Sequence, residues 1–224
     1  MDTDSKPDYP ALVIDGSGSE VFAGVLDENG QWLSQSRQSG APLEHLFPTV
    51  EATLKQAALE LSDLRSYLYC EGPGSVLGLR LCAMAIETWS RLYPQSAAYF
   101  AYNTLQLCAQ LLCTDKDLPK RTLLVSDWKK GAWNAIEIID GAAGATTVAD
   151  DATIAEWEGA VYHLPQRKGW QKPPSNAQSI EYTPQRLPEV LTNANWMKPT
   201  QGVELYSSGV NTFAKWTPDR HRAT

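Results

Sequence analysis

The sequence contains no uninterrupted apolar stretch of about 20 residues, the length that a membrane-spanning helix needs. The N-terminal segment, MDTDSKPDYP, is acidic and polar. It lacks the basic start and the apolar core of a signal peptide. We therefore expect no interaction with a membrane and a cytoplasmic location.

Cysteine and histidine are both scarce in this chain. The four cysteines form no CxxC pair and stand among apolar residues: Cys70, Cys82, Cys108 and Cys113. This pattern favours reduced, buried thiols over a disulfide framework or a zinc site. The three histidines are far apart in the sequence, at His45, His163 and His221. No two of them have the spacing of paired metal ligands on a helix, so we predict no metal site.

Positive charge is also limited. Lys and Arg number 19 against 26 Asp and Glu, which gives a formal net charge of -7 and a pI near 5.0. A free-standing nucleic-acid binder needs Lys and Arg to neutralise phosphates, so we expect no direct nucleic-acid binding by this chain alone. Two basic segments, Arg167–Trp170 and Arg220–Arg222, could touch RNA phosphates, but we interpret them as a solvated loop and a solvated tail.

The most strongly marked stretch that is present runs from Tyr69 to Trp89, YCEGPGSVLGLRLCAMAIETW. Ser66–Cys70, which overlaps its start, has the residues of a buried strand end. Gly72–Gly74 predicts a tight turn, because glycine and proline adopt the backbone angles that such turns require. Ser75 then stands at the expected N-cap of a helix, where its hydroxyl accepts a hydrogen bond from the first turn.

The predicted helix after this turn is apolar on nearly every side. Two stripes at helical spacing are joined by a third apolar set: Val76, Leu79, Ala83 and Ile86; Leu81, Met84, Thr88 and Leu92; and Leu77, Cys82, Ala85 and Trp89. A helix packed on one sheet needs only one such stripe. We therefore expect a second cover, provided either by other elements of this chain or by another protein.

The first half of the chain predicts the element order βββαβαβα. Three strands form a meander with an Asn-Gly hairpin, and two more strands alternate with three helices. The expected elements are Ala11–Ile14, Glu20–Leu26, Gln31–Ser36, Leu43–Leu61, Ser66–Cys70, Val76–Leu92, Ala97–Tyr102 and Thr104–Cys113. We predict a first subdomain over residues 11–114, after a flexible tail at 1–10.

The second half has shorter apolar segments. We expect strands at Thr122–Ser126, Ala132–Ile138, Ala160–His163 and Val203–Tyr206, and a short helix at Pro184–Asn193. These elements predict a shortened second subdomain over residues 121–212. A polar tail is expected at 213–224.

Three motifs resemble the TsaB (YeaZ) family. They are Ile14–Ser17 after a buried strand, Glu44–Pro48, which is close to His-Ser-x-x-Leu-x-Pro, and Gly72–Arg80, where the family usually has Gly-Pro-Gly-Ser-Phe-Thr-Gly-x-Arg. The match covers about the first half, and the chain is identified as a divergent member. The resemblance implies an α/β fold with two ribonuclease-H-like subdomains of the actin and sugar-kinase type, the second of them shortened.

The resemblance also implies a function. TsaB proteins are non-catalytic partners of TsaD in the synthesis of threonylcarbamoyladenosine on tRNA. We therefore expect a scaffold with no catalytic residues and no required cofactor, which binds a TsaD-like protein or a second copy of itself through its two long helices. The residues expected at this interface are Phe47, Val50, Leu54, Leu81, Met84 and Thr88.

An alternative interpretation is the remnant of an ATPase or kinase that binds ATP or ADP. Glycine turns and helix N-termini offer backbone N–H groups to phosphate. Turns like Asp15–Ser19 and Glu71–Ser75 bind nucleotide phosphates in the superfamily that the resemblance implies. The candidate phosphate-binding residues are Asp15, Gly16, Ser17, Gly72, Gly74 and Ser75, and Asp15 could hold a metal ion bound to phosphate.

These turn residues also have a structural interpretation. Asp15 could simply close an Asx turn, and Ser75 could simply cap a helix. The second half of the sequence supplies no further glycine-rich phosphate loop with acidic or hydroxyl neighbours. A third possibility is a stand-alone homodimer with a role outside tRNA modification.

Overall fold

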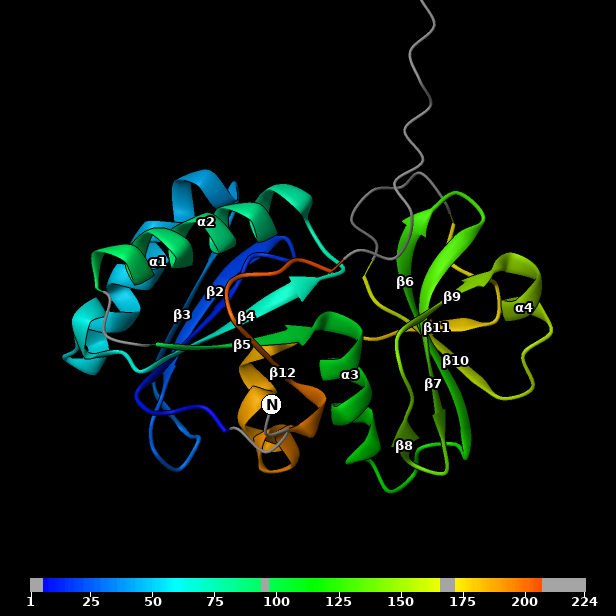
Figure 1. Cartoon of the computed structure of the whole chain (residues 1–224). Coiled ribbons are helices and arrows are strands. Elements are labelled where there is room, and N and C mark those ends of the chain that lie inside the picture. The colour runs from blue at the N-terminus through cyan, green and yellow to red at the C-terminus, as the bar shows by residue number, and fades with distance from the viewer. Residues whose placement is uncertain (1–5, 94–96, 166–171, 207–224) are drawn as a thin grey trace, which may run out of the picture.

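The computed structural model describes residues 6–93, 97–165 and 172–206 (Figure 1). Two sheets stand side by side, and α3 (Thr104–Cys113) lies between them. The basic segments Arg167–Trp170 and Arg220–Arg222 and the predicted tail at 213–224 lie outside the described residues. Over the described ranges, the helices lack the length and apolar character that crossing a bilayer requires.

The first sheet has the strand order β12-β5-β4-β1-β2-β3. Its antiparallel meander consists of β1 (Ala11–Asp15), β2 (Glu20–Leu26) and β3 (Trp32–Ser39). Next to β1 lie β4 (Ser66–Gly72) and β5 (Ala98–Asn103), which run parallel to it. With their helices, these strands have the predicted order βββαβαβα. The α/β class and the ribonuclease-H-like arrangement are confirmed.

Local chemistry accounts for the meander. Residues of β1 alternate between two core clusters, with Leu12 and Ile14 on one face of the sheet and Ala11 and Val13 on the other. A strand buried on both faces must be apolar at every position, as this one is. The hairpin between β2 and β3 closes at Asp27, whose Oδ1 accepts the N–H groups of residues 29 and 31 at 2.9 and 2.8 Å.

Helices cover both faces of the first sheet. One face carries α1 (Pro42–Ala57) and α2 (Val76–Leu92), which lie side by side above it in Figure 1. The first of these ends before the predicted Leu61, because Ala58 adopts a left-handed conformation with φ 54° and a 3₁₀ turn, η1 (Leu61–Asp63), follows. The opposite face packs against α3 and the later segment 184–197.

The second sheet has the order β11-β10-β6-β7-β8, with β9 also paired to β7. Its elements are β6 (Arg121–Lys129), β7 (Ala132–Ile139), β8 (Ala142–Ala143), β9 (Thr147–Asp150), α4 (Asp151–Ala155), β10 (Ala160–His163) and β11 (Ala177–Ser179). The predicted strands at 122–126, 132–138 and 160–163 are confirmed. In the described part of this unit, α4 has only five residues, which agrees with the expectation of a shortened unit.

The chain then returns to the first sheet, which the sequence did not predict. The 3₁₀ segment η2 (Pro184–Trp196) replaces the expected α-helix at 184–193, and Pro188 lies inside it. A proline has no N–H to donate, so it interrupts an α-helical ladder. The short strand β12 (Lys198–Thr200) pairs with β5, whereas the predicted strand at 203–206 is not formed. Residues 184–206 therefore pack on the first sheet although we assigned them to the second subdomain.

Two smaller expectations concern the cysteines and the N-terminal tail. All four cysteines are free thiols, and Cys70, Cys82 and Cys108 are buried as predicted, whereas Cys113 is only partly buried. The described end of the expected tail is held against the sheet, because Asp8 N donates to Ser66 Oγ at 2.8 Å and Arg65 N donates to Pro10 O at 2.9 Å. Tyr9 packs against the core between the sheet and η2.

Candidate functional site

The structure brings the two predicted glycine turns together. Ser75 N donates to Ser17 O at 2.8 Å, so the turn before α2 is bonded to the turn after β1. A Cβ on Gly74 would lie 2.5 Å from the Cβ of Ser17, and a Cβ on Gly78 would lie 2.0 Å from the carbonyl oxygen of Gly16. Real Cβ atoms do not approach other atoms this closely, so glycine is required at both positions for the turns to pack.

Asp15 is the centre of a buried hydrogen-bond cluster. Its Oδ1 accepts the N–H of Ser17 at 2.7 Å, which makes the predicted Asx turn. Its Oδ2 accepts the hydroxyl of Tyr102 from β5 at 2.7 Å and also the hydroxyl of Tyr182. Burial, and then the charge of Asp15, raise the pKa of both tyrosines well above the ordinary value, so both hydroxyls keep their protons and act as donors.

Three backbone donors of the turns are already engaged. Ser17 N bonds to Asp15, Ser75 N bonds to Ser17 O, and Gly78 N bonds to the Ser75 hydroxyl at 3.3 Å. The last bond makes Ser75 the N-cap of α2, as predicted. A phosphate held by these turns would have to replace bonds that the chain makes with itself. The phosphate-binding role of Asp15, Gly16, Ser17, Gly72, Gly74 and Ser75 stays a prediction, and the geometry gives it little support.

The two described histidines are engaged in local contacts. His45 Nδ1 lies 2.8 Å from Gln38 Oε1, and His163 Nδ1 lies 3.0 Å from Leu164 O. Among the described residues, no three His, Cys, Asp or Glu side chains are grouped as metal ligands. His221 lies outside the described residues.

The predicted interface residues on α1 divide into exposed and buried side chains. Phe47 is 55% exposed, whereas Val50 and Leu54 are 3% and 7% exposed and belong to the core between the helices and the sheet. The expectation that all three project outward is therefore wrong for Val50 and Leu54. Both follow the same apolar spacing as Phe47, and the side chain of Phe47 is rotated just past the edge of the buried face.

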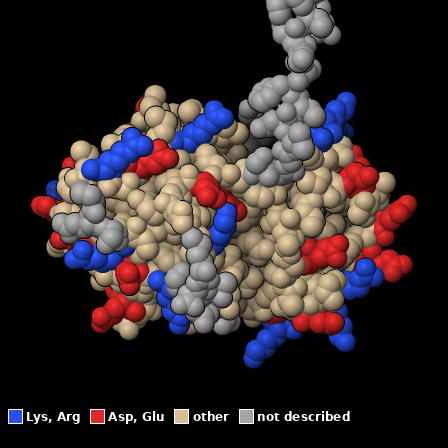
Figure 2. All heavy atoms as spheres, in the orientation of Figure 1, with Lys and Arg blue, Asp and Glu red and all other residues tan. Residues whose placement is uncertain are grey.

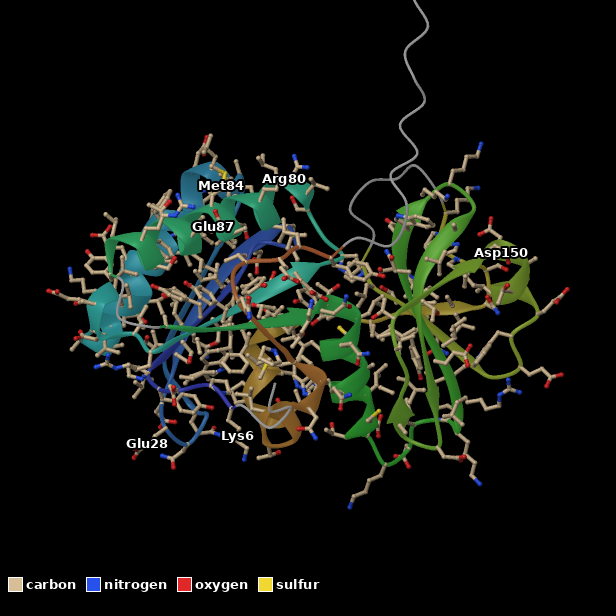
Figure 3. All side chains as sticks on the ribbon, viewed as in Figure 1. Lys6, Glu28, Arg80, Met84, Glu87 and Asp150 are labelled. Carbon is tan, nitrogen blue, oxygen red and sulfur yellow. The ribbon has the colours of Figure 1, made fainter. Side chains whose placement is uncertain are left out.

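On α2, an apolar stripe faces away from the sheet. It runs through residues three or four positions apart, which we call the α2 stripe: Leu77, Leu81, Met84, Thr88 and Leu92. Met84 is 63% exposed, Leu77 and Leu92 are more than half exposed, and Leu81 is partly buried. The Thr88 hydroxyl donates to Met84 O at 2.7 Å, which leaves its methyl group on the surface without an unpaired polar atom. Figure 3 shows Met84 and Arg80 projecting from the outer side of α2.

A groove connects the two helices. The edge of the Phe47 ring contacts Trp89 of α2, with ring centroids 6.1 Å apart. Beside this contact a groove of about 370 Å³ is lined by Phe47, Val50, Glu51, Leu54, Lys55, Leu59, Leu61 and Trp89. Buried Val50 and Leu54 thus form part of its floor. The groove and the α2 stripe, together with exposed Leu43 and Val76, form what we call the outer helical face.

Four exposed apolar residues of this face were missing from the predicted interface: Leu43, Val76, Leu77 and Leu92. The signal that was overlooked is the helical spacing of Leu43 to Phe47 and of Leu77 to Leu81. Figure 2 shows charged side chains of both signs scattered over this part of the surface, with neither sign collected in one block. Apolar contact, rather than a field of one sign, is therefore what the face offers to a partner.

Comparisons with known proteins show the fold. No protein-family model matches the sequence, and no curated protein sequence is significantly similar to it. YeaZ from Pseudomonas aeruginosa superposes with a TM-score of 0.59 at 18% identity, over 82% of this chain and 91% of that one. An uncharacterized protein described as similar to peptidase YeaZ from Pseudomonas aeruginosa gives 0.61 at 17% identity, over 88% and 98% of the two chains. The chain thus has the fold of YeaZ, as its motifs predicted.

Proposed function

We propose that this chain is a TsaB-like scaffold that docks onto a TsaD-like protein in the synthesis of threonylcarbamoyladenosine on tRNA. It performs no chemistry of its own and holds the partner in its active form. The outer helical face is the docking surface. The observation that carries this proposal is the exposed apolar surface on α1 and α2, with Phe47 and Met84 each more than half exposed.

Energetics support docking at this face. Apolar surface removed from water contributes about 25 cal/mol per Å². Covering a few hundred Å² of apolar surface therefore contributes on the order of 10 kcal/mol before the entropy cost of association is subtracted. Phe47 stands at the rim of the groove and Met84 at the middle of the α2 stripe, so these two side chains are the expected anchors.

The alternative of a nucleotide-dependent enzyme has less support. The carboxylate of Asp15 accepts three hydrogen bonds from the chain itself, two of them from the hydroxyls of buried Tyr102 and partly buried Tyr182. At the second turn, the N–H groups of Ser75 and Gly78 bond to the Ser17 carbonyl oxygen and to the Ser75 hydroxyl. To hold a metal–phosphate group, Asp15 and these N–H groups would therefore have to give up bonds that they make within the chain.

The test is an association measurement with matched variants. The full chain is mixed with the TsaD-like protein of the same organism, and the mass of the mixture is measured by light scattering after size exclusion. Met84→Glu places a charge in the centre of the α2 stripe and should weaken association at least about ten-fold, because an unpaired charge is costly to desolvate. Val148→Glu is the control, since Val148 is also exposed but lies on β9 of the second sheet.

The outcomes separate the versions of the proposal. A complex that forms with wild type and Val148→Glu but not with Met84→Glu supports docking through this face. A doubled mass for the chain alone, abolished by Met84→Glu, would assign the same face to a homodimer. Equal association of all three proteins with the partner would refute the placement of the interface.

A further inference from the structure

The segment that returns from the second sheet to the first, residues 180–206, is fastened at both ends. It leaves the second sheet where Ile180 N donates to His163 O at 3.0 Å. Two residues later, the hydroxyl of Tyr182 reaches the carboxylate of Asp15 at the end of β1. At its other end, Tyr206 N donates to Glu71 O at 2.8 Å, immediately before the turn that starts α2.

Tyr182 occupies the boundary between the two sheets. Its ring packs against the core between the first sheet and η2, and also against the core between α3 and the second sheet. Its hydroxyl lies 4.0 Å from Cys70 Sγ of β4 and bonds to Asp15 together with the hydroxyl of Tyr102. One side chain of the returning segment therefore contacts both cores and a buried carboxylate.

The middle of the segment adds contacts to the first sheet. Trp32 Nε1 donates to Gln185 O at 2.7 Å, and β12 pairs with β5. Further along, Glu204 N donates to the Tyr69 hydroxyl at 2.8 Å. The segment thus connects Asp15, at the first glycine turn, to Glu71, at the second one.

We propose that Tyr182 is a latch residue, whose hydrogen bond to Asp15 holds residues 180–206 on the first sheet and thereby positions the turn from which α2 starts. Asp15 is then the fixed anchor of this latch. The hydroxyl of Tyr182 can be removed without opening a large cavity, because phenylalanine keeps the ring that packs on both cores. The proposal rests on the proposed function in one respect only, which is that α2 serves as a docking element.

Hydrogen exchange of the isolated full chain tests the latch. In Tyr182→Phe, amides of residues 180–206 should exchange at least about ten-fold faster, the factor expected when a hydrogen bond to a charged group is lost. Peptides covering 69–79 should also exchange faster, because Glu71 and the α2 turn are held by the far end of the segment. Peptides covering 121–139 should be unchanged. The control is Tyr162→Phe, a tyrosine of β10 that packs against the α3-facing core of the second sheet.

Three results would overturn the latch. They are unchanged exchange at 180–206, faster exchange there with no change at 69–79, and an equal acceleration in every peptide, which would indicate only a less stable fold. Because no partner protein is present, failure of this experiment leaves the docking proposal standing. A failed association measurement would likewise leave the latch intact.

Discussion

The glycine turns and the outer helical face were both candidate sites. They differ in how far their groups already have partners within the chain. At the turns, Ser17, Ser75 and Gly78 donate their N–H groups to oxygens of the same chain, and Asp15 is covered by two tyrosines. On the helical face, large apolar side chains remain in water. The difference favours the helical face over the turns as the surface that a partner would cover.

The largest effect on the stability of the fold is expected from a substitution that tests which α1 residues face inward. Val50→Glu places a carboxylate at a position that is 3% exposed, so it should cost about 4 kcal/mol or more and remove most of the folded protein. Met84→Glu, at an exposed position, should leave the stability within about 0.5 kcal/mol of wild type.

Circular dichroism during thermal unfolding distinguishes these variants. If Val50→Glu melts at the same temperature as wild type, Val50 faces solvent and belongs to the interface, as the sequence predicted. Loss of folded signal in Met84→Glu would show instead that the α2 stripe is buried within the chain.

The next effect concerns the packing of the two turns. Gly78→Ala in α2 would bring a Cβ to 2.0 Å from Gly16 O, so we expect a loss of about 3 kcal/mol or more. By helix propensity alone, the same change would stabilise the protein by about 1 kcal/mol, so the sign of the effect is informative. The matched control is Gly202→Ala, where a Cβ meets no atom within 4 Å. A melting temperature for Gly78→Ala at or above that of wild type would mean that the turns are not in contact.

A smaller effect involves Glu71, the last residue before the second turn. Burial raises the pKa of this carboxyl above its ordinary 4.5. Its protonated form is therefore favoured by folding, and its contribution to stability is fully present below pH 4.5 and is lost as the pH rises through the folded pKa. Glu71→Gln should flatten this decline and raise the stability at pH 7 by less than about 1 kcal/mol, since the group is only partly buried. Urea unfolding at several pH values measures both quantities, and a steeper decline in the variant would contradict this assignment.

The smallest effect on the melting temperature is expected from added nucleotide. A ligand bound with a Kd of 10 μM and present at 1 mM would stabilise the fold by about 2.7 kcal/mol, which is several degrees in melting temperature. Because Asp15 and three N–H groups of the turns are bonded within the chain, we expect shifts below about 1 °C with ATP, ADP and magnesium. A saturable shift of several degrees that disappears in Asp15→Asn would show that the glycine turns bind nucleotide, and it would favour the turns over the helical face as the functional site.

Much of the first sheet could be predicted because its signals are local. The apolar run Ala11–Ile14, the Asn-Gly hairpin and Gly72–Ser75 each specify a short piece of backbone with neighbouring residues. The same locality explains why Ser75 was correctly placed as the cap of α2.

The parts that were missed depend on contacts between distant residues. Tyr182 and Asp15 are 167 positions apart, and β12 is the sequence Lys-Pro-Thr, which carries no strand pattern and is tolerated because the strand lies at a sheet edge. The split between exposed Phe47 and buried Val50 depends on how far α1 is rotated over the sheet. Helical spacing defines an apolar stripe but leaves this rotation open.

Hydrogen exchange of the full chain with and without the TsaD-like partner tests the contrast between the glycine turns and the outer helical face most directly. The account predicts slower exchange in the complex at 43–57 and 76–92, with little change at 15–19 beyond that caused by docking of α2, and none at 121–163. Protection confined to the second sheet, or a complex that leaves both long helices unprotected, would contradict it.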